Sequence, residues 1–344
     1  MGVCDGSQFL KTLLDVVVFG MQANSTHRYH FTLLDHDPTS IAKILVILHL
    51  LSEVQGNIPS YEKDVAIAAM IFVYAPHITP ESAHKKLQKS LDTLTKKLRD
   101  EMPIPNWIFI HPSQQSELCH YLEAWKEHTQ GIYNTRVIQE RPRIPFNTGQ
   151  PGLSDETGSS KRKSSSTYKT GEHIFEKSRI TKPDNASLES HDPALRQLFQ
   201  ALSHYKAEIY DEINNHLDQN LKLNVTLSEV DYKNRGAAKG TSGISRHLFD
   251  LAGRLHGQPI DGIQEIAELN DVFQRLSSFF QALSVCIDED IGARLAVELV
   301  VGEMEDCLER IRYDTCKYRT PIRGLVDPQL FPKMYDRIHM SYIP

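Results

Sequence analysis

The chain has 344 residues, of which 40% are hydrophobic, and it carries a formal net charge of -6 with a pI near 6.2. This content allows a sizeable core, and the length suits two average domains or one large domain with insertions. The acidic balance argues against a general nucleic-acid or membrane-surface binder. A membrane span needs roughly 20 consecutive apolar residues, and no run in the sequence is that long. We therefore expect neither nucleic acid nor a membrane as a partner.

Cysteine and histidine usage indicates neither a disulfide framework nor a metal site. The five cysteines are widely spaced and form no Cys-x-x-Cys pair, and the 16 histidines form no His-Glu-x-x-His motif. The N-terminus lacks the pattern of a secretory signal. We expect a cytoplasmic or nuclear protein with reduced cysteines and no bound metal.

The first part of the chain, residues 1–54, is predicted to begin an α/β domain. Gly2, Asp5 and Gly6 form a glycine-acid turn, and apolar residues at helical spacing follow between residues 9 and 17. In an α/β unit such a turn usually follows a strand, and no strand precedes Gly2. The sequence therefore reads as an α/β domain truncated at its first strand, as in a fragment or a shortened gene model.

The clearest strand-helix unit runs from residue 28 to residue 51. Tyr29 and the apolar residues after it suit a buried strand that ends at Asp35. Asp37 is placed to cap the next helix, with Pro38 at its first position. In open α/β sheets, nucleotides bind beside carboxylates at such strand ends. The alternative is an ordinary turn acid with a conformational role.

Residues 55–138 are predicted to form a helical insertion. Residues 65–74 are apolar almost throughout, which fits a buried helix or a strand, and we favour the helix. A helix from residue 79 to about residue 99, a short strand at 107–110 and a helix at 113–126 follow.

Residues 139–190 are predicted to form a disordered linker. Proline, glycine and serine are frequent here, and the segment offers too little apolar surface to offset the entropy of ordering it. Its basic triplet, Lys161 to Lys163, fits a nuclear address, a phosphorylation platform or a plain solvated linker.

A second helical insertion is predicted over residues 191–290. Asp192-Pro193 opens the longest helix, whose apolar stripe extends for roughly 28 residues, or ~40 Å. The glycine-rich stretch 236–243 lacks the Gly-x-x-x-x-Gly-Lys-Ser pattern of a phosphate cradle, and we interpret it as a mobile loop. Helices at about 245–255 and 263–285 follow.

The last segment, residues 291–344, returns to alternating strand and helix patterns. A strand at 293–301 ends at Gly302-Glu303 and leads into a helix, and residues 335–341 read as a further strand. The predicted fold class is therefore α/β, with a partial Rossmann-like, methyltransferase-like parallel sheet and a large, mostly helical insertion.

Three segments resemble a known family: His30–Pro38 (HFTLLDHDP), Val297–Glu303 (VELVVGE) and Tyr335–Pro344 (YDRIHMSYIP). They look like the fungal domain-of-unknown-function family 4470. That family is often joined to a MYND zinc finger and is related to the N-terminal domain of dynein axonemal assembly factor 3. It is similar in outline to S-adenosylmethionine-dependent methyltransferases. The resemblance covers the two ends of the chain and makes the middle an insertion between the second and third sheet strands.

The resemblance implies a cofactor site for S-adenosylmethionine, with each role carried over to a matching position. Gly2, Asp5 and Gly6 correspond to the cofactor loop, Asp35 to the acid that holds the ribose, and Glu303 to the acid near the adenine. The remaining two positions, which would border the transferred methyl group, are Ser341 and Tyr342.

Two functions of different classes follow from these observations, and a third possibility is a truncated fragment with no function of its own. The first is a methyltransferase-like domain, in which positioning does most of the work and no catalytic residue stands out, although His339 or Tyr342 is placed to act as a base. The second is an inactive scaffold that kept the fold and binds protein partners. Cys4 in the cofactor loop and the large helical insertion favour the scaffold, whereas Asp35 and Glu303 favour the enzyme.

Overall fold

The computed structural model describes most of the predicted elements of the chain. The described residues are 6–22, 28–55, 59–74, 78–100, 102, 104–127, 188, 192–202, 208–220, 222–223, 226, 272–287, 294–313, 315, 319 and 331–332. In chain order, the elements are α1 (Ser7–Gln22), β1 (Tyr29–Asp35), α2 (Pro38–Glu53), α3 (Ser60–Tyr74), β2 (Ile78–Thr79), α4 (Glu81–Arg99), β3 (Ile108–Ile110), α5 (Pro112–Glu127), α9 (Pro193–Leu202), α10 (Glu208–Asn220), β4 (Lys222–Leu223), α13 (Val272–Cys286), β5 (Leu295–Val301) and α15 (Met304–Arg312).

The chain divides into two compact units, each built from separate stretches of sequence. The first unit comprises residues 1–74, 82–130 and 279–344, and the second comprises residues 75–81 and 131–278. The parallel sheet belongs to the first unit.

Among the described residues, the sheet has three parallel strands in the order β1-β5-β3. β1 and β5 pair along their whole length, from Tyr29 opposite Leu295 to Asp35 opposite Val301. On its other side, β5 pairs with the shorter β3, with Phe109 opposite Glu298. Parallel strands require crossover connections, and helices supply them here. The predicted fold class, a partial Rossmann-like α/β sheet with a largely helical insertion, is confirmed.

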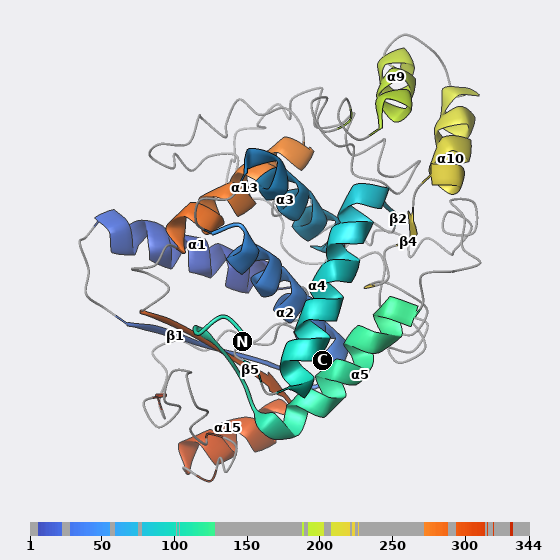
Figure 1. Cartoon of the computed structure of the whole chain (residues 1–344). Helices are drawn as coiled ribbons and strands as arrows, with labels where there is room; N and C mark the ends of the chain where they lie inside the picture. Colours follow the sequence, from blue (N-terminus) through green and yellow to red (C-terminus); the bar gives the residue numbers. More distant parts are fainter. Residues whose placement is uncertain are drawn as a thin grey trace, which may run out of the picture. The chain divides into compact units, whose positions relative to one another are not determined.

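Helices cover both faces of the sheet, as a parallel sheet requires. Successive strand residues point to opposite faces. On one face Phe31 meets Phe9 of α1 with ring centroids 5.5 Å apart. On the other face Leu34 and Val300 pack with Cys307 of α15. Figure 1 shows α1 and α2 on one side of β1 and β5, and α15 on the other.

α2 is the central helix of this unit. Every residue from Thr39 to Leu51 is buried, because the helix packs against the sheet, α3 and α5. Its N-terminus has the predicted cap, since the Asp37 carboxylate accepts from the Thr39 amide at 3.0 Å and Pro38 follows. The local sequence therefore predicts this helix correctly, from its cap to its apolar interior.

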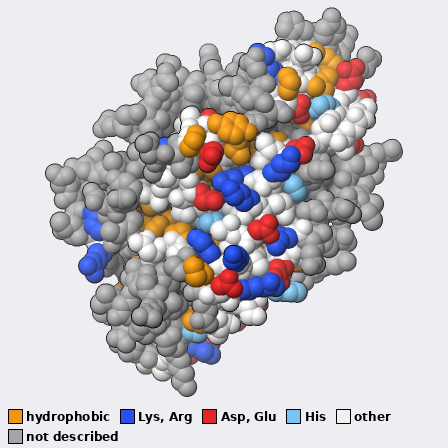
Figure 2. Space-filling model, in the orientation of Figure 1, with side chains coloured by type: hydrophobic (Ala, Val, Ile, Leu, Met, Phe, Trp, Pro, Cys, Tyr) orange, Lys and Arg blue, Asp and Glu red, His pale blue; other side chains and the backbone are white. Residues whose placement is uncertain are grey.

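α4 is amphipathic in the way its sequence predicts. Leucines at helical spacing point inward: Leu87, Leu91, Leu94 and Leu98. The opposite face is charged and joins α5 through ion pairs such as Lys126 with Asp92. In Figure 2, acidic and basic side chains are interspersed on the face that α4 and α5 present in Figure 1, which is the pattern of a solvated helix pair.

The prediction of one long helix from residue 193 onward is wrong. The structure has two helices, α9 and α10, that pack against each other. His216 Nε2 lies 2.8 Å from Asp192 Oδ2, whereas a continuous helix would hold positions 24 residues apart at ~36 Å. Buried residues of the two stripes, Leu195 and Phe199 of α9 and Ile213 and Leu217 of α10, supply an apolar face on each helix. The apolar stripe that the sequence shows as continuous is thus divided between two helices that pack against each other (Figure 1).

Several other expectations have clear outcomes. The helix favoured over residues 65–74 is confirmed as α3, and the strand and helix on either side of Gly302 are confirmed as β5 and α15. The predictions for residues 236–243, 245–255 and 335–341 lie outside the described residues, and so does the predicted linker 139–190 except for Leu188, which is helical and buried. Within the described part of the chain, no helix is both long and apolar enough to cross a membrane.

Candidate functional site

The turn from β1 into α2 is built around two carboxylates. Asp35 Oδ1 accepts a hydrogen bond from the Asp37 amide at 3.0 Å and lies 3.4 Å from His36 Nδ1. Asp37 accepts from the Thr39 hydroxyl at 2.6 Å as well as from its amide. Only 11% of the Asp35 side chain is exposed, whereas 75% of His36 is. The Asp35 carboxylate therefore fixes the turn and still reaches the surface at the carboxyl end of the strand.

The end of β5 lies directly beside this turn. The Gly302 amide donates to the Asp35 carbonyl at 2.9 Å, which continues the β1-β5 ladder past Val301. Glu303 is exposed and precedes α15 as its N-cap, with no capping hydrogen bond from its side chain. A Cβ at position 302 would lie 2.7 Å from Cys307 Sγ, so this turn is tight enough to require glycine or a shift of α15.

Of the seven residues predicted for a cofactor site, the structure brings Asp35 and Glu303 to the ends of neighbouring parallel strands. Gly6 is buried before α1 with a φ of +75°, and its neighbour is Ile44 of α2, whose Cδ1 would lie 2.1 Å from a Cβ added at residue 6. A positive φ and this close approach both favour glycine. The other four, Gly2, Asp5, Ser341 and Tyr342, lie outside the described residues, as do Cys4 and His339.

The end of β3 adds residues that the sequence analysis did not select. His111 follows the strand, and its Nδ1 accepts from the Ser113 amide at 3.1 Å and lies 2.6 Å from the Ser113 hydroxyl oxygen. An amide can only donate, so this imidazole is neutral and carries its proton on Nε2. Burial lowers the pKa of His111 below its usual value, against the opposing influence of Glu298.

Gln114 of α5 closes the third strand end. Its Nε2 donates to the Val301 carbonyl at 2.6 Å, and its Oε1 accepts from the Val301 amide at 3.2 Å. The side-chain amide thus pairs with the end of β5 beyond Ile110, where β3 has already stopped. All three strand ends are fixed by named hydrogen bonds, and they form one edge of the sheet.

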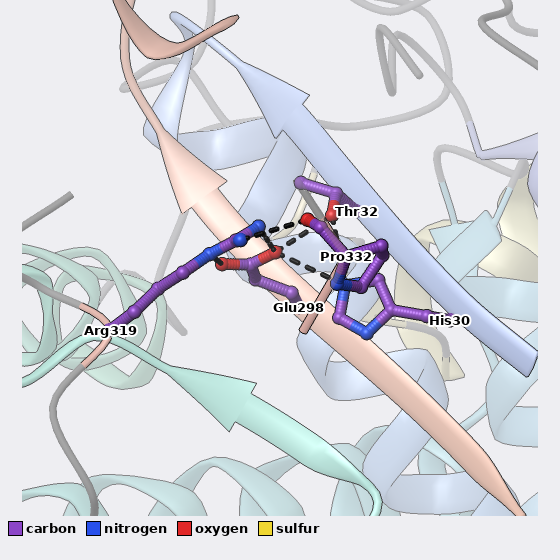
Figure 3. A network of polar contacts seen from close by, with 5 residues as sticks. All are labelled: His30, Thr32, Glu298, Arg319 and Pro332. Carbon is purple, nitrogen blue, oxygen red and sulfur yellow. Dashed lines mark hydrogen bonds and ion pairs between the residues drawn. The ribbon is translucent and has the colours of Figure 1, made fainter. Parts of the chain in front are cut away.

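A buried carboxylate, Glu298, lies in the middle of β5 behind this edge (Figure 3). Arg319 binds it with two hydrogen bonds of 2.9 Å, from Nε to Oε1 and from Nη2 to Oε2. Oε2 also accepts from the Thr32 hydroxyl at 2.7 Å and lies 3.2 Å from His30 Nε2. The glutamate side chain is 0% exposed and that of Arg319 is 9% exposed.

These partners decide the charge of Glu298. Burial alone would raise its pKa, but the hydrogen bonds from His30, Arg319 and Thr32, together with the positive charge of Arg319, outweigh burial and hold the pKa below the ordinary value. A carboxylate with several donors keeps its charge even in a buried position. The sheet therefore contains an ionised glutamate at its centre.

One signal of this network is visible in the sequence. Glu298 is a charged residue inside an otherwise apolar strand, and such a residue is almost always paired. Its partners could not be found in the same way, because Thr32 is 266 residues away and Arg319 follows 21 residues later.

Comparisons with protein-family models, with curated proteins and with solved structures find no match to this chain. The family resemblance of the three segments therefore stays a prediction. Among the residues that the structure describes, no group of three or more histidine, cysteine, aspartate or glutamate side chains could hold a metal ion.

Proposed function

We propose that the carboxyl edge of the sheet binds an adenosine-containing cofactor, and that this cofactor is S-adenosylmethionine. The observation that carries the proposal is the pairing of β1 with β5, which ends in Asp35 on one strand and is followed by Gly302-Glu303 on the other. Ligands of open α/β sheets bind outside the carboxyl ends of the strands, where carboxylates accept hydrogen bonds from ribose hydroxyls.

In this proposal the residues keep the roles that the family resemblance implies. Asp35 accepts from the ribose, Glu303 lies near the adenine, and Gly2, Asp5 and Gly6 belong to the cofactor loop. The final two positions, Ser341 and Tyr342, border the methyl group. The class of reaction is methyl transfer, to which the chain contributes mainly by holding the cofactor and the acceptor in line.

Calorimetric titration of the full chain with S-adenosylmethionine tests the proposal. Wild type should bind with micromolar affinity, and Asp35→Asn should bind at least tenfold more weakly, because a charge-assisted hydrogen bond contributes about 1.5–3 kcal/mol. Asparagine keeps the oxygen that accepts from the Asp37 amide, so the turn is retained. Glu303→Gln should also weaken binding.

Glu309→Gln is the matched control, since Glu309 is an exposed acid of α15 away from the strand ends. Its affinity should equal that of wild type. The absence of heat at millimolar S-adenosylmethionine in the wild-type chain would end the proposal, and so would an unchanged affinity in Asp35→Asn.

A second candidate is an inactive protein-binding scaffold, and one observation favours it. Asp35 already accepts from the Asp37 amide and is 11% exposed, which is how a carboxylate with a purely conformational role behaves. Under this alternative Asp35→Asn lowers the thermal stability slightly, while neither protein binds the cofactor.

A further inference from the structure

Glu298 joins the sheet to two points of the chain that follow α15. The first is Arg319, which it binds with two hydrogen bonds. The second is reached through the same guanidinium, because Arg319 Nη1 donates to the Pro332 carbonyl at 3.0 Å. Figure 3 shows the Arg319 guanidinium approaching Glu298 and the Pro332 carbonyl from one side, with His30 and Thr32 on the other side of the carboxylate.

Phe331 adds an apolar contact to the same face of the sheet. Its ring centroid lies 4.3 Å from that of His30 on β1 and 5.1 Å from that of Phe109 on β3, and the Arg319 guanidinium lies 5.6 Å from it. His30, Thr32, Glu298 and Phe109 occupy alternating positions of the paired strands, so all four face the same way. Phe331 itself is buried.

We propose that the ionised Glu298 is a latch that holds Arg319 and Phe331-Pro332 against this face, and that these residues engage and detach together. The bidentate geometry suits an all-or-none contact, since a guanidinium that leaves gives up both parallel hydrogen bonds at once. Detachment also leaves Glu298 without its cation, which is strongly unfavourable, so the detached state is scarce in wild type. This inference does not depend on the cofactor proposal.

Trypsin digestion of the full native chain measures the latch directly. Trypsin must take the arginine side chain into its primary pocket, and Arg319 is held by Glu298. The rate of cleavage after Arg319 therefore reports the population of the detached state. Arg312, at the exposed end of α15, is the reference site within the same molecule. Peptide mass spectrometry gives the two rates from one sample.

In wild type we expect cleavage after Arg319 to lag far behind cleavage after Arg312. Glu298→Gln keeps the shape of the side chain but removes the charge. It should raise the rate of cleavage after Arg319, divided by the rate after Arg312, by about tenfold or more, the equivalent of losing one hydrogen bond to a charged group. Glu309→Gln makes the same chemical change at an exposed position of α15, and it should leave the ratio unchanged.

Thr32→Val is a second variant that separates local detachment of Arg319 from general unfolding of the protein. It removes one uncharged donor and leaves the ion pair, so it should raise the ratio by a smaller factor while the thermal midpoint stays close to wild type. Equal cleavage after Arg312 and Arg319 in wild type would overturn the latch. A ratio unchanged in both Glu298→Gln and Thr32→Val would overturn it as well.

Discussion

At the residue scale, His49 is a buried titratable group. It lies within α2, and neither nitrogen of its ring has a hydrogen-bond partner among the described residues. Burial lowers its pKa to about 4, with Lys97 and Lys86 of α4 acting in the same direction and Glu53 of its own helix opposing them. The folded protein therefore keeps this histidine neutral, whereas the unfolded chain protonates it near pH 6.5.

We predict that His49 makes the protein sensitive to mild acid. The pKa of His49 in the folded protein lies below that in the unfolded chain. Above pH 6.5 the histidine is neutral in both states and has no effect, whereas the free energy of unfolding decreases as the pH falls from 6.5 towards 4. The total loss amounts to about 3 kcal/mol. In His49→Leu this loss should disappear, so urea denaturation at pH 7 and pH 4 should show a smaller drop for the variant.

The control for this experiment is His120→Gln, which changes an exposed histidine of α5. It should lose as much stability as wild type between the two pH values. If wild type and His49→Leu lose equal stability, His49 is not the source of the acid sensitivity.

At the element scale, the sequence predicted those helices whose caps and apolar patterns lie within the helix itself or directly beside it. Asp37, Pro38 and the apolar run after them define α2 without help from the rest of the chain. The prediction of one long helix from residue 193 onward was wrong because the contact that decides it is not local. Asp192 meets His216 through a contact 24 residues apart, and the sequence between Leu202 and Glu208 contains no glycine or proline that would predict a helix end.

We predict that Asp192 holds the α9-α10 hairpin through both of its oxygens. It accepts from the Leu195 amide at 2.9 Å at the start of α9, and both oxygens lie within 3.0 Å of His216 Nε2. Asp192→Ala removes the cap and the histidine partner and should cost about 1–2 kcal/mol. Asp192→Asn keeps a capping oxygen and should cost less.

Hydrogen exchange of the α9 and α10 amides checks this ordering. Exchange should be fastest in Asp192→Ala, intermediate in Asp192→Asn and slowest in wild type. Equal exchange in the alanine variant and wild type would show that the apolar stripes alone hold the two helices together.

At the scale of the whole molecule, long-range and local contacts are both present. The parallel sheet joins strands that begin at residues 29, 108 and 295, and β2 pairs with β4 from residue 78 to residue 223, while α9 and α10 are neighbours in the chain. The sequence predicted each of these strands from its apolar residues. It could not predict the order β1-β5-β3 or the Glu298 network, because pairing partners so far apart leave no local pattern.

We predict that the units respond separately to a core mutation. Leu299 lies buried in the central strand opposite Leu33 and Ile110, and Leu299→Ala should cost about 2–5 kcal/mol. Hydrogen exchange should accelerate in β1, β5 and β3 and stay unchanged in α9 and α10. Leu217→Ala, in the buried stripe of α10, should do the reverse. Acceleration of both regions by either variant would mean that the chain opens as one cooperative unit.

The pairing of β1 with β5 also has a consequence during synthesis. Thr32 leaves the ribosome 266 residues before Glu298, and translation at about 5–20 residues per second makes that interval roughly 13–50 s. Throughout that time the nascent β1 lacks its partner strand β5, and Thr32 and His30 lack the Glu298 carboxylate to which they hydrogen-bond. We therefore expect the growing polypeptide to depend on chaperones that shield exposed strands until Glu298 has been translated.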